Sequence, residues 1–257
     1  MTGVLVGALI AASNTPAREF APPVGQPRPF ALPARHEFRL ANGLTVTLVP
    51  FGAVPKATIL IDVRTGNVAD GDKNGLADIV ASLMKEGAGS RDAAALADAA
   101  ADMGGALELG AGADQLSLTM DVLAERAGDA IALAADVLRR PQLPEQQLPR
   151  LKADLARQTA IARSQPQAIA GEAFAHLVWD DSVYGRTLPT DAQIAAIGID
   201  DVRRFVAAEL GATRTHVYVA GKIDRAAIEA AVRRAFGDWA AGPPPRQGAP
   251  QPPHARR

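Results

Sequence analysis

The segment NGLADIVASLMKEGAGSRDAAALADAAADMGGALE, residues 74–108, decides the fold. Apolar residues recur at the spacing of one helical face in its first part, which predicts a helix over residues 74–85 that ends before Gly87. These apolar residues are Leu76, Ile79, Val80 and Leu83. Ser90 is then expected to cap a second helix over residues 93–103, which the Gly104-Gly105 pair stops.

Three strands are expected before this segment. The Asn42-Gly43 pair supplies the positive φ angles of a tight turn, so the β-prone runs at residues 36–40 and 44–49 form a hairpin. The run ATILIDV at residues 57–63 is the third strand.

The elements expected after the segment complete an α+β pattern. Strands are predicted at residues 106–109 and 115–122, with a turn over residues 110–114 between them. A further strand is expected at residues 213–220, and helices at residues 124–138, 145–163, 166–178, 199–209 and 225–236. Hairpin-linked strands and grouped helices predict a two-layer sandwich, in which helices cover one face of a mostly antiparallel sheet.

The chain divides into three parts by composition. Residues 1–35 combine a signal-like apolar run at residues 4–12 with a Pro-rich lead-in. Residues 36–240 form the predicted α+β domain, and residues 241–257 form a Pro-rich linker or tail. The apolar run favours an exported or periplasmic protein, although no Lys or Arg precedes it; the alternative is an apolar tail. It is too short to span a bilayer.

Charge and cysteine content exclude several classes of function. The 27 basic and 28 acidic residues nearly cancel, so no overall field attracts nucleic acid or an anionic membrane. The chain has no cysteine, which excludes disulfides, thiolate metal sites and cysteine nucleophiles. No phosphate-binding or dinucleotide-binding glycine pattern and no G-x-S-x-G motif occurs.

Several segments, in order, resemble the first, N-terminal half of a subunit of the pitrilysin and insulinase family of inverted zinc metallopeptidases, which includes the mitochondrial processing peptidase. The resemblance spans residues 38–239 and includes the loop at Gly66. It rests on residues 74–108 and on FRLANGLTVTLVP (38–50), PQAIAGEAFAHLVWDDSVYGRTLPTDAQIAAI (166–197), VYVAGKID (217–224) and FGDW (236–239).

The resemblance implies that this chain has no catalytic centre. Active members carry H-x-x-E-H on the helix after the third strand, because zinc takes two imidazoles one helical turn apart and the glutamate acts as general base. The matching positions here are Asp78, Ala81 and Ser82. The family's third ligand, a glutamate on a later helix, falls on Gln158 or Thr159.

The sequence offers two other sources of metal ligands. Asp154 lies about one turn from the third-ligand position, but a single carboxylate does not make a zinc site. The four histidines form no i, i+4 pair, so a metal site would need residues from distant parts of the chain. They are His36, His176, His216 and His254.

The resemblance implies an accessory subunit. Such a subunit forms a heterodimer with an active zinc peptidase, helps to enclose and bind the peptide substrate, and needs no cofactor of its own. One alternative is a structural, core-type assembly protein without a peptidase partner; another is a metallopeptidase with an unrecognised site that includes Asp78 and Asp154.

The extent of the resemblance suggests a further partner. Subunits of this family contain two similar halves, and the resemblance covers only the first. The Pro-rich residues 242–253 stand where the linker to the second half is expected. The second half is therefore expected in another chain, or the sequence is a fragment.

Overall fold

A computed structural model describes residue 25 and residues 31–244. All elements below lie in one compact unit that begins at Pro33. The signal-like run at residues 4–12, most of the Pro-rich lead-in and His254 lie outside the described residues.

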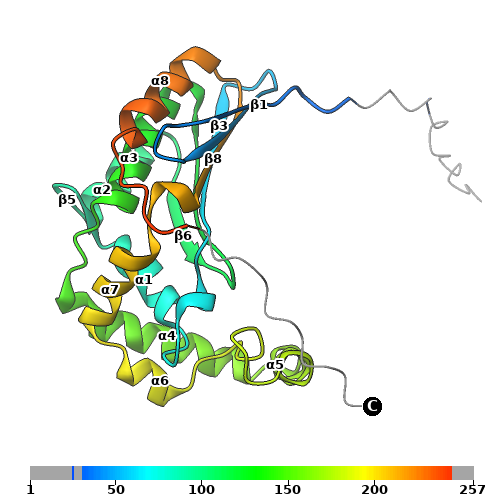
Figure 1. Ribbon diagram of the computed structural model, residues 1–257, viewed down its shortest axis with the longest axis vertical. Helices are drawn as coiled ribbons and strands as arrows, with labels where there is room; N and C mark the ends of the chain where they lie inside the picture. Colours follow the sequence, from blue (N-terminus) through cyan, green and yellow to red (C-terminus); the bar gives the residue numbers. More distant parts are fainter. Residues whose placement is uncertain (1–24, 26–30, 245–257) are drawn as a thin grey trace, which may run out of the picture. The chain divides into compact units, whose positions relative to one another are not determined.

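A six-stranded sheet forms one layer of this unit (Figure 1). Its order is β1-β2-β8-β3-β7-β6, and every neighbouring pair is antiparallel except β2 and β8. The mostly antiparallel sheet of the sequence analysis is therefore confirmed. The strands are β1 (His36–Arg39), β2 (Thr45–Pro50), β3 (Lys56–Val63), β6 (Leu107–Ala111), β7 (Leu116–Leu123) and β8 (Thr215–Gly221).

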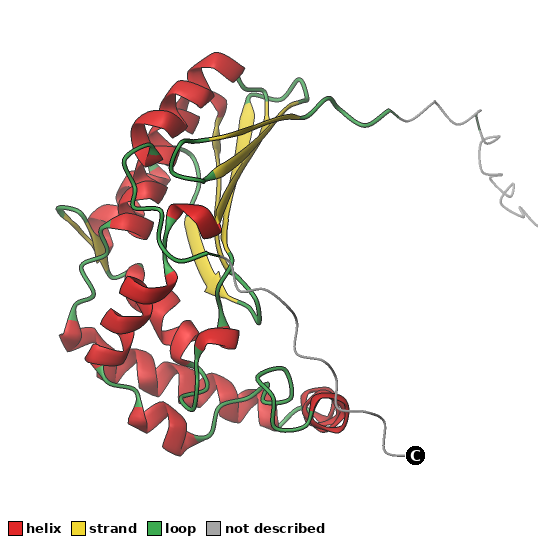
Figure 2. Ribbon diagram, in the orientation of Figure 1, coloured by secondary structure: helices red, strands yellow, loops and turns green. Residues whose placement is uncertain are grey.

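Among the described elements, helices cover one face of the sheet and none covers the other, which we call the bare face, while α5 lies beyond the end of the sheet (Figure 2). They are α1 (Leu76–Met84), α2 (Ala93–Ala101), α3 (Ala127–Arg139), α4 (Leu148–Arg163), α5 (Pro166–Trp179), α6 (Asp191–Ala196), α7 (Ile199–Glu209) and α8 (Arg225–Phe236). Short 3-10 turns precede α3 and α4, at Ala124–Arg126 and Glu145–Gln147. The two-layer α+β sandwich is thus as predicted.

Alternation along the central strands separates the two faces of the sheet. In β3 and β7, side chains that face the helices are fully buried, among them Ile59, Ile61 and Leu118. Their neighbours in the strand point to the bare face and are partly or fully exposed, as are Thr58 and Asp62. Because the buried side chains lie between the sheet and the helices, this is where the hydrophobic core lies. Burying each large aliphatic side chain there stabilises the fold by about 1.5–3 kcal/mol.

The helix α1 starts two residues later than the sequence predicts. Gly75 adopts a positive φ of 92° before the first turn, a conformation that favours glycine. The carboxylate of Asp70 accepts hydrogen bonds from the backbone N–H groups of Gly75 and Ala77, both at 2.8 Å. A buried acid from the preceding loop therefore caps this helix.

Four further details differ from the sequence-based expectations. Asp92, not Ser90, caps α2, because its Oδ1 accepts from the Ala95 N–H at 2.9 Å directly before the first helical residue. Ser90 instead lies in the turn of a two-stranded ribbon, β4 (Gly87–Ala88) and β5 (Arg91–Asp92), that was not predicted. Residues 110 and 111, expected in a turn, continue β6, and the short α6 was missed.

Candidate functional site

A groove of about 260 Å³ lies between α1, α4 and β6. Four of the five positions matched to the family's metal site line it: Asp78, Ala81 and Ser82 from α1 and Gln158 from α4. Asp154 lines it as well, whereas the buried Thr159 does not. The fold therefore brings together residues that are far apart in the sequence and that the resemblance alone had grouped.

Asp78 is held by a neighbouring amide. The Asn67 Nδ2 donates to Asp78 Oδ2 at 2.9 Å and to Asp70 Oδ2 at 3.2 Å, so one amide bridges two carboxylates. Burial raises the pKa of Asp78, and the hydrogen bond from Asn67 partly opposes that rise. Burial also raises the pKa of Asp70 to about 6, against the hydrogen bonds that it accepts.

Asp154 is engaged by two arginines on its own helix. The Arg157 guanidinium lies 2.9 Å from Asp154 Oδ1, and that of Arg150 lies 3.4 Å from Oδ2. Arg150 also pairs with Glu86 at 2.6 Å. Both oxygens of this carboxylate thus already have cationic partners.

The groove does not supply the donors that zinc requires. Protein zinc sites use imidazole, thiolate and carboxylate ligands, and three protein ligands are usual at a catalytic zinc. The described groove offers Asp78 bound to an amide, Asp154 bound to arginines, a hydroxyl from Ser82 and an amide from Gln158. None of its lining residues is a histidine, and Ala81 cannot move a proton.

The strand β6 forms one wall of the groove and one edge of the sheet. Within the described residues it pairs only with β7, so its outer edge has no neighbouring strand. Leu109, Gly110 and Ala111 of β6 line the groove opposite the α1 residues. An unpaired strand edge beside a groove can accept an extended peptide as an added strand.

The described histidines lie outside this groove. His216 on β8 stacks on Tyr218, with 3.9 Å between ring centroids, and its Nε2 lies 2.8 Å from Thr47 Oγ1. The His36 Nδ1 lies 3.3 Å from an Arg225 nitrogen. His216 thus contacts residues of two strands, and His36, at the start of β1, contacts the first residue of α8.

His176 has a different setting. Its ring and the carboxylates of Asp180 and Asp181 place one ligand atom each within 4.8 Å of one another, at the end of α5. In the described part of the chain this is the one such group of three. All three side chains are exposed, and groups of this kind are common without an ion, so we assign no site to them.

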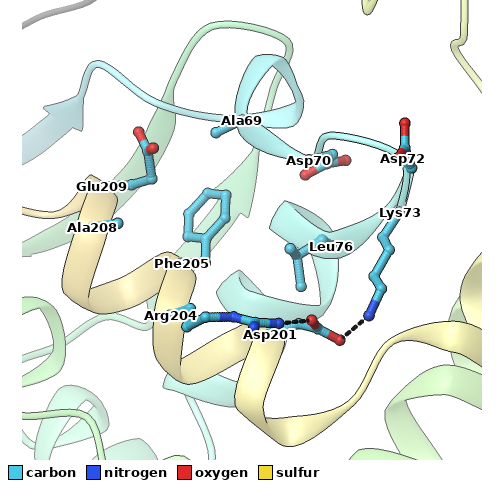
Figure 3. A pocket seen from close by; sticks show the side chains of 10 residues that line it. All are labelled: Ala69, Asp70, Asp72, Lys73, Leu76, Asp201, Arg204, Phe205, Ala208 and Glu209. Carbon is cyan, nitrogen blue, oxygen red and sulfur yellow. Dashed lines mark hydrogen bonds and ion pairs between the residues drawn. The ribbon is translucent and has the colours of Figure 1, made fainter.

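A second cavity, of about 340 Å³, lies between α7 and the loop before α1 (Figure 3). The Asp201 carboxylate pairs there with both Lys73 and Arg204 and accepts from the Gly198 N–H at 2.8 Å. Burial alone would raise the pKa of Asp201, but hydrogen bonds from Lys73, Gly198 and Arg204 outweigh it and hold that pKa below its usual value. These partners connect α7 to the loop that carries Asp70.

Sequence reasoning missed this connection because nothing local marks it. Lys73 and Asp201 are 128 residues apart, and each reads as an ordinary exposed charge near a helix end. The only signal was the acidic first turn of α7, which is typical of any helix N-terminus.

Comparison with known protein families shows to which family the chain belongs. Residues 52–191, more than half of the chain, match the family model described as insulinase (peptidase family M16). The chain belongs to the insulinase family. An uncharacterized zinc protease of Rickettsia bellii is 22% identical over 206 residues, 79% of this chain and 50% of that protein. A probable mitochondrial-processing peptidase subunit beta of Arabidopsis thaliana is also 22% identical, over 79% of this chain and 39% of that protein.

Two solved structures share the fold. A peptidase M16 inactive domain from Pseudomonas fluorescens superposes with a TM-score of 0.77 at 20% identity, covering 86% of this chain and 54% of that one. The periplasmic protease PqqL of Escherichia coli gives a TM-score of 0.76 at 12% identity, covering 85% of this chain and 25% of that one.

The insulinase-family match concerns only part of each relative. The chain spans half or less of the length of the relatives that it matches. None of the described helices combines the length and the apolar character needed to cross a membrane.

Proposed function

We propose that this chain is a non-catalytic insulinase-family domain that works beside an active zinc peptidase and helps to enclose and bind its peptide substrate. The observation that carries the proposal is the groove, where the positions matched to the metal site converge without a fitting set of donors. The inactive insulinase-family domain from Pseudomonas fluorescens supports it as a relative of the same fold.

In this proposal the chain binds peptide and the partner supplies the chemistry. The free edge of β6 offers backbone N–H and C=O groups to an extended peptide, and Asp78, Ser82 and Gln158 line the opposite wall. The bare, largely polar face of the sheet forms wall surface for an enclosed chamber. Zinc bound by the partner polarises the scissile carbonyl.

The proposed working unit is the α+β domain of residues 36–240, and its partners are an active zinc subunit and a second half-domain. The matched segment covers only 50% of two relatives, which supports the second partner. We also propose export to the periplasm, because the apolar run at residues 4–12 resembles a signal segment and one relative in fold is a periplasmic protease.

The test is reconstitution with the nearest homologue from the same genome that retains H-x-x-E-H. The full chain is titrated into this homologue, and cleavage of a quenched peptide library is followed. We expect the chain to raise the homologue's cleavage rate at least several-fold and to saturate at a fixed stoichiometry. A stable complex with unchanged cleavage would instead favour the structural assembly protein, and cleavage by the chain alone would favour an unrecognised active site.

A further inference from the structure

The groove between α1, α4 and β6 offers a set of oxygen acceptors. Asp78 and Ser82 are four residues apart on α1 and lie on the same face of that helix, and Gln158 reaches the groove from α4. They carry a carboxylate, a hydroxyl and an amide carbonyl. Among the described side chains, none pairs with Ser82 or Gln158, and only Asn67 hydrogen-bonds to Asp78. Three oxygen acceptors with spare capacity therefore line one small space.

Asp78 has no cationic partner in the described part of the chain. Three basic side chains near it on α4 are engaged elsewhere. Arg150 and Arg157 pair with Asp154, and Lys152 donates to two backbone carbonyls near the end of α6, at 2.6 and 2.8 Å. A half-buried carboxylate without a counter-charge is costly, and burial raises the pKa of Asp78 accordingly. The groove can therefore take up one positive charge from a ligand.

The other walls of the groove are largely apolar. Ile79 of α1, Leu109 of β6 and Leu151 and Leu155 of α4 line it. Its volume of about 260 Å³ lies below the ~300 Å³ at which pockets for whole small molecules begin, so the space suits a single side chain. Apolar walls around a few oxygen acceptors match a side chain with an apolar stem and a cationic end.

Hydrogen-bond geometry favours lysine over arginine as that side chain. An ammonium group donates three hydrogen bonds in different directions, one for each acceptor here. A guanidinium binds best to both oxygens of one carboxylate, and Asn67 already donates to Oδ2 of Asp78, which weakens such a contact. We propose that the groove binds a lysine side chain of the peptide, with its ammonium group among Asp78, Ser82 and Gln158.

The strand β6 explains how a peptide delivers this side chain. Leu109, Gly110 and Ala111 form the wall opposite α1 and belong to the strand whose outer edge has no neighbour among the described elements. Successive side chains of an added strand point to opposite faces, so every second residue of a peptide on this edge points to the helix side, where the groove lies. The inference rests on the proposed function and deepens it, because it names the side chain that the groove selects.

The experiment measures which side chain the groove selects. Short capped peptides of alternating threonine and serine carry lysine, arginine or norleucine at one central position, and their binding to the full-length chain is followed by fluorescence anisotropy. Norleucine keeps the apolar stem but has no ammonium group. An uncapped norleucine peptide, whose only amine is its N-terminus, and calcium ions as a competitor distinguish other cations from lysine.

Three variants locate the site. Asp78→Asn removes the charge, and Ser82→Ala removes one acceptor. Asp98→Asn, which changes an exposed acid on α2 outside the groove, is the matched control for loss of one carboxylate. A carbodiimide, which couples an amine to a carboxylate in contact with it, joins the lysine peptide to the chain, and mass spectrometry then identifies the coupled residue. Circular dichroism checks that each variant is folded.

We expect the lysine peptide to bind about tenfold or more tightly than the norleucine peptide, which corresponds to ~1.4 kcal/mol, and also more tightly than the arginine peptide. Asp78→Asn should abolish this preference, Ser82→Ala should reduce it, and Asp98→Asn should leave it unchanged. Carbodiimide should couple the lysine peptide to Asp78.

Several outcomes would overturn the lysine site. These are equal binding of the lysine and norleucine peptides, a lysine preference that survives Asp78→Asn, equally tight binding of the uncapped norleucine peptide, and displacement of the lysine peptide by calcium. If the chain still raises the homologue's cleavage in the reconstitution, the proposed function stands in each case.

Two outcomes bear on the proposed function itself. A lysine preference that depends on Asp78, without any rise in the homologue's cleavage, would support the lysine site and contradict the accessory role. Absence of binding by any of the peptides to the parent chain would overturn the lysine site together with the peptide-binding part of the proposed function.

Discussion

At the scale of single residues, Asn67 defines the chemistry of the groove. Its amide bridges Asp70 and Asp78, so the carboxylate at the first position of the metal motif is tied to the cap of the same helix. The hydrogen bond from Asn67 to Asp78 therefore links the loop before α1 to that helix. Asp154 likewise has neighbouring partners, because each of its carboxylate oxygens pairs with an arginine.

The raised pKa of Asp70 makes the unfolding free energy of the chain fall as pH rises. Burial raises its pKa from 3.8 to about 6, so the folded state holds this proton over a range in which the unfolded chain has released it. The contribution to stability is fully present below pH 3.8 and is lost as pH rises through about 6, on the order of 3 kcal/mol in all.

The variant Asp70→Asn tests this, because it cannot titrate. We expect the unfolding free energy of the parent chain relative to this variant to fall between pH 4 and pH 7, measured by urea denaturation. Asp72→Asn, an exposed neighbour, is the matched control for the loss of one carboxylate. A difference between parent and Asp70→Asn that stays constant with pH would contradict the raised pKa.

Restoring ligands tests the match between this chain and the zinc motif. Asp78, Ser82 and Gln158 line one groove, so the triple change Asp78→His, Ser82→His and Gln158→Glu should create a three-ligand site. We expect about one zinc per chain after dialysis, measured by plasma mass spectrometry. The double change Asp78→His and Ser82→His is the control and should retain less. A folded triple variant without zinc would show that these positions do not converge as a metal site requires.

The site could be predicted from the sequence only in part. The resemblance grouped Asp78, Ala81, Ser82 and Gln158 because family motifs preserve chain order, and the groove contains all four. It could not separate Gln158 from Thr159, since one residue turns a helical side chain by 100° and only packing decides which of the two faces the groove. The hydrogen-bond and ion-pair partners of Asp78 and Asp154 could not be predicted from the sequence either, because side-chain contacts depend on tertiary geometry.

At the scale of elements, helices and strands with a clear turn residue or apolar periodicity were predicted from the sequence. Short elements without such a pattern were not. The Asn42-Gly43 turn and the apolar period of α7 and α8 gave elements within a residue or two of those observed. The ribbon of β4 and β5 has two residues in each strand, too few for any periodicity. The capping box of α6, with Thr190 and Gln193, was the available signal for that short helix, and it was overlooked.

The alternation of faces in the sheet predicts which truncations matter. Leu118 on β7 is fully buried against the helices, whereas Leu60 on the neighbouring β3 points to the bare face and is half-buried. We expect Leu118→Ala to lower the unfolding free energy by about 2–5 kcal/mol, because it leaves a cavity in the core. Leu60→Ala should cost ~1 kcal/mol. Chemical denaturation compares them, and equal losses would contradict the assignment of the two faces.

At the scale of the whole molecule, residues 31–244 form one insulinase-family α+β unit, and no helix or strand among these residues covers one face of the sheet or the outer edge of β6. The chain covers 50% of one relative and 54% of one solved structure, which supports the proposed pairing with a further domain. The proposed division of labour follows, with peptide binding here and zinc chemistry in the partner.

Zinc binding by the isolated full-length chain shows whether its groove can hold a catalytic metal. The chain is saturated with zinc and dialysed, and its bound metal and its cleavage of the peptide library are measured, with His176→Ala as a control for the exposed group at the end of α5. We expect no stoichiometric zinc that survives His176→Ala, and no cleavage. One zinc per chain that persists in His176→Ala and is lost in Asp78→Ala, together with cleavage, would contradict it.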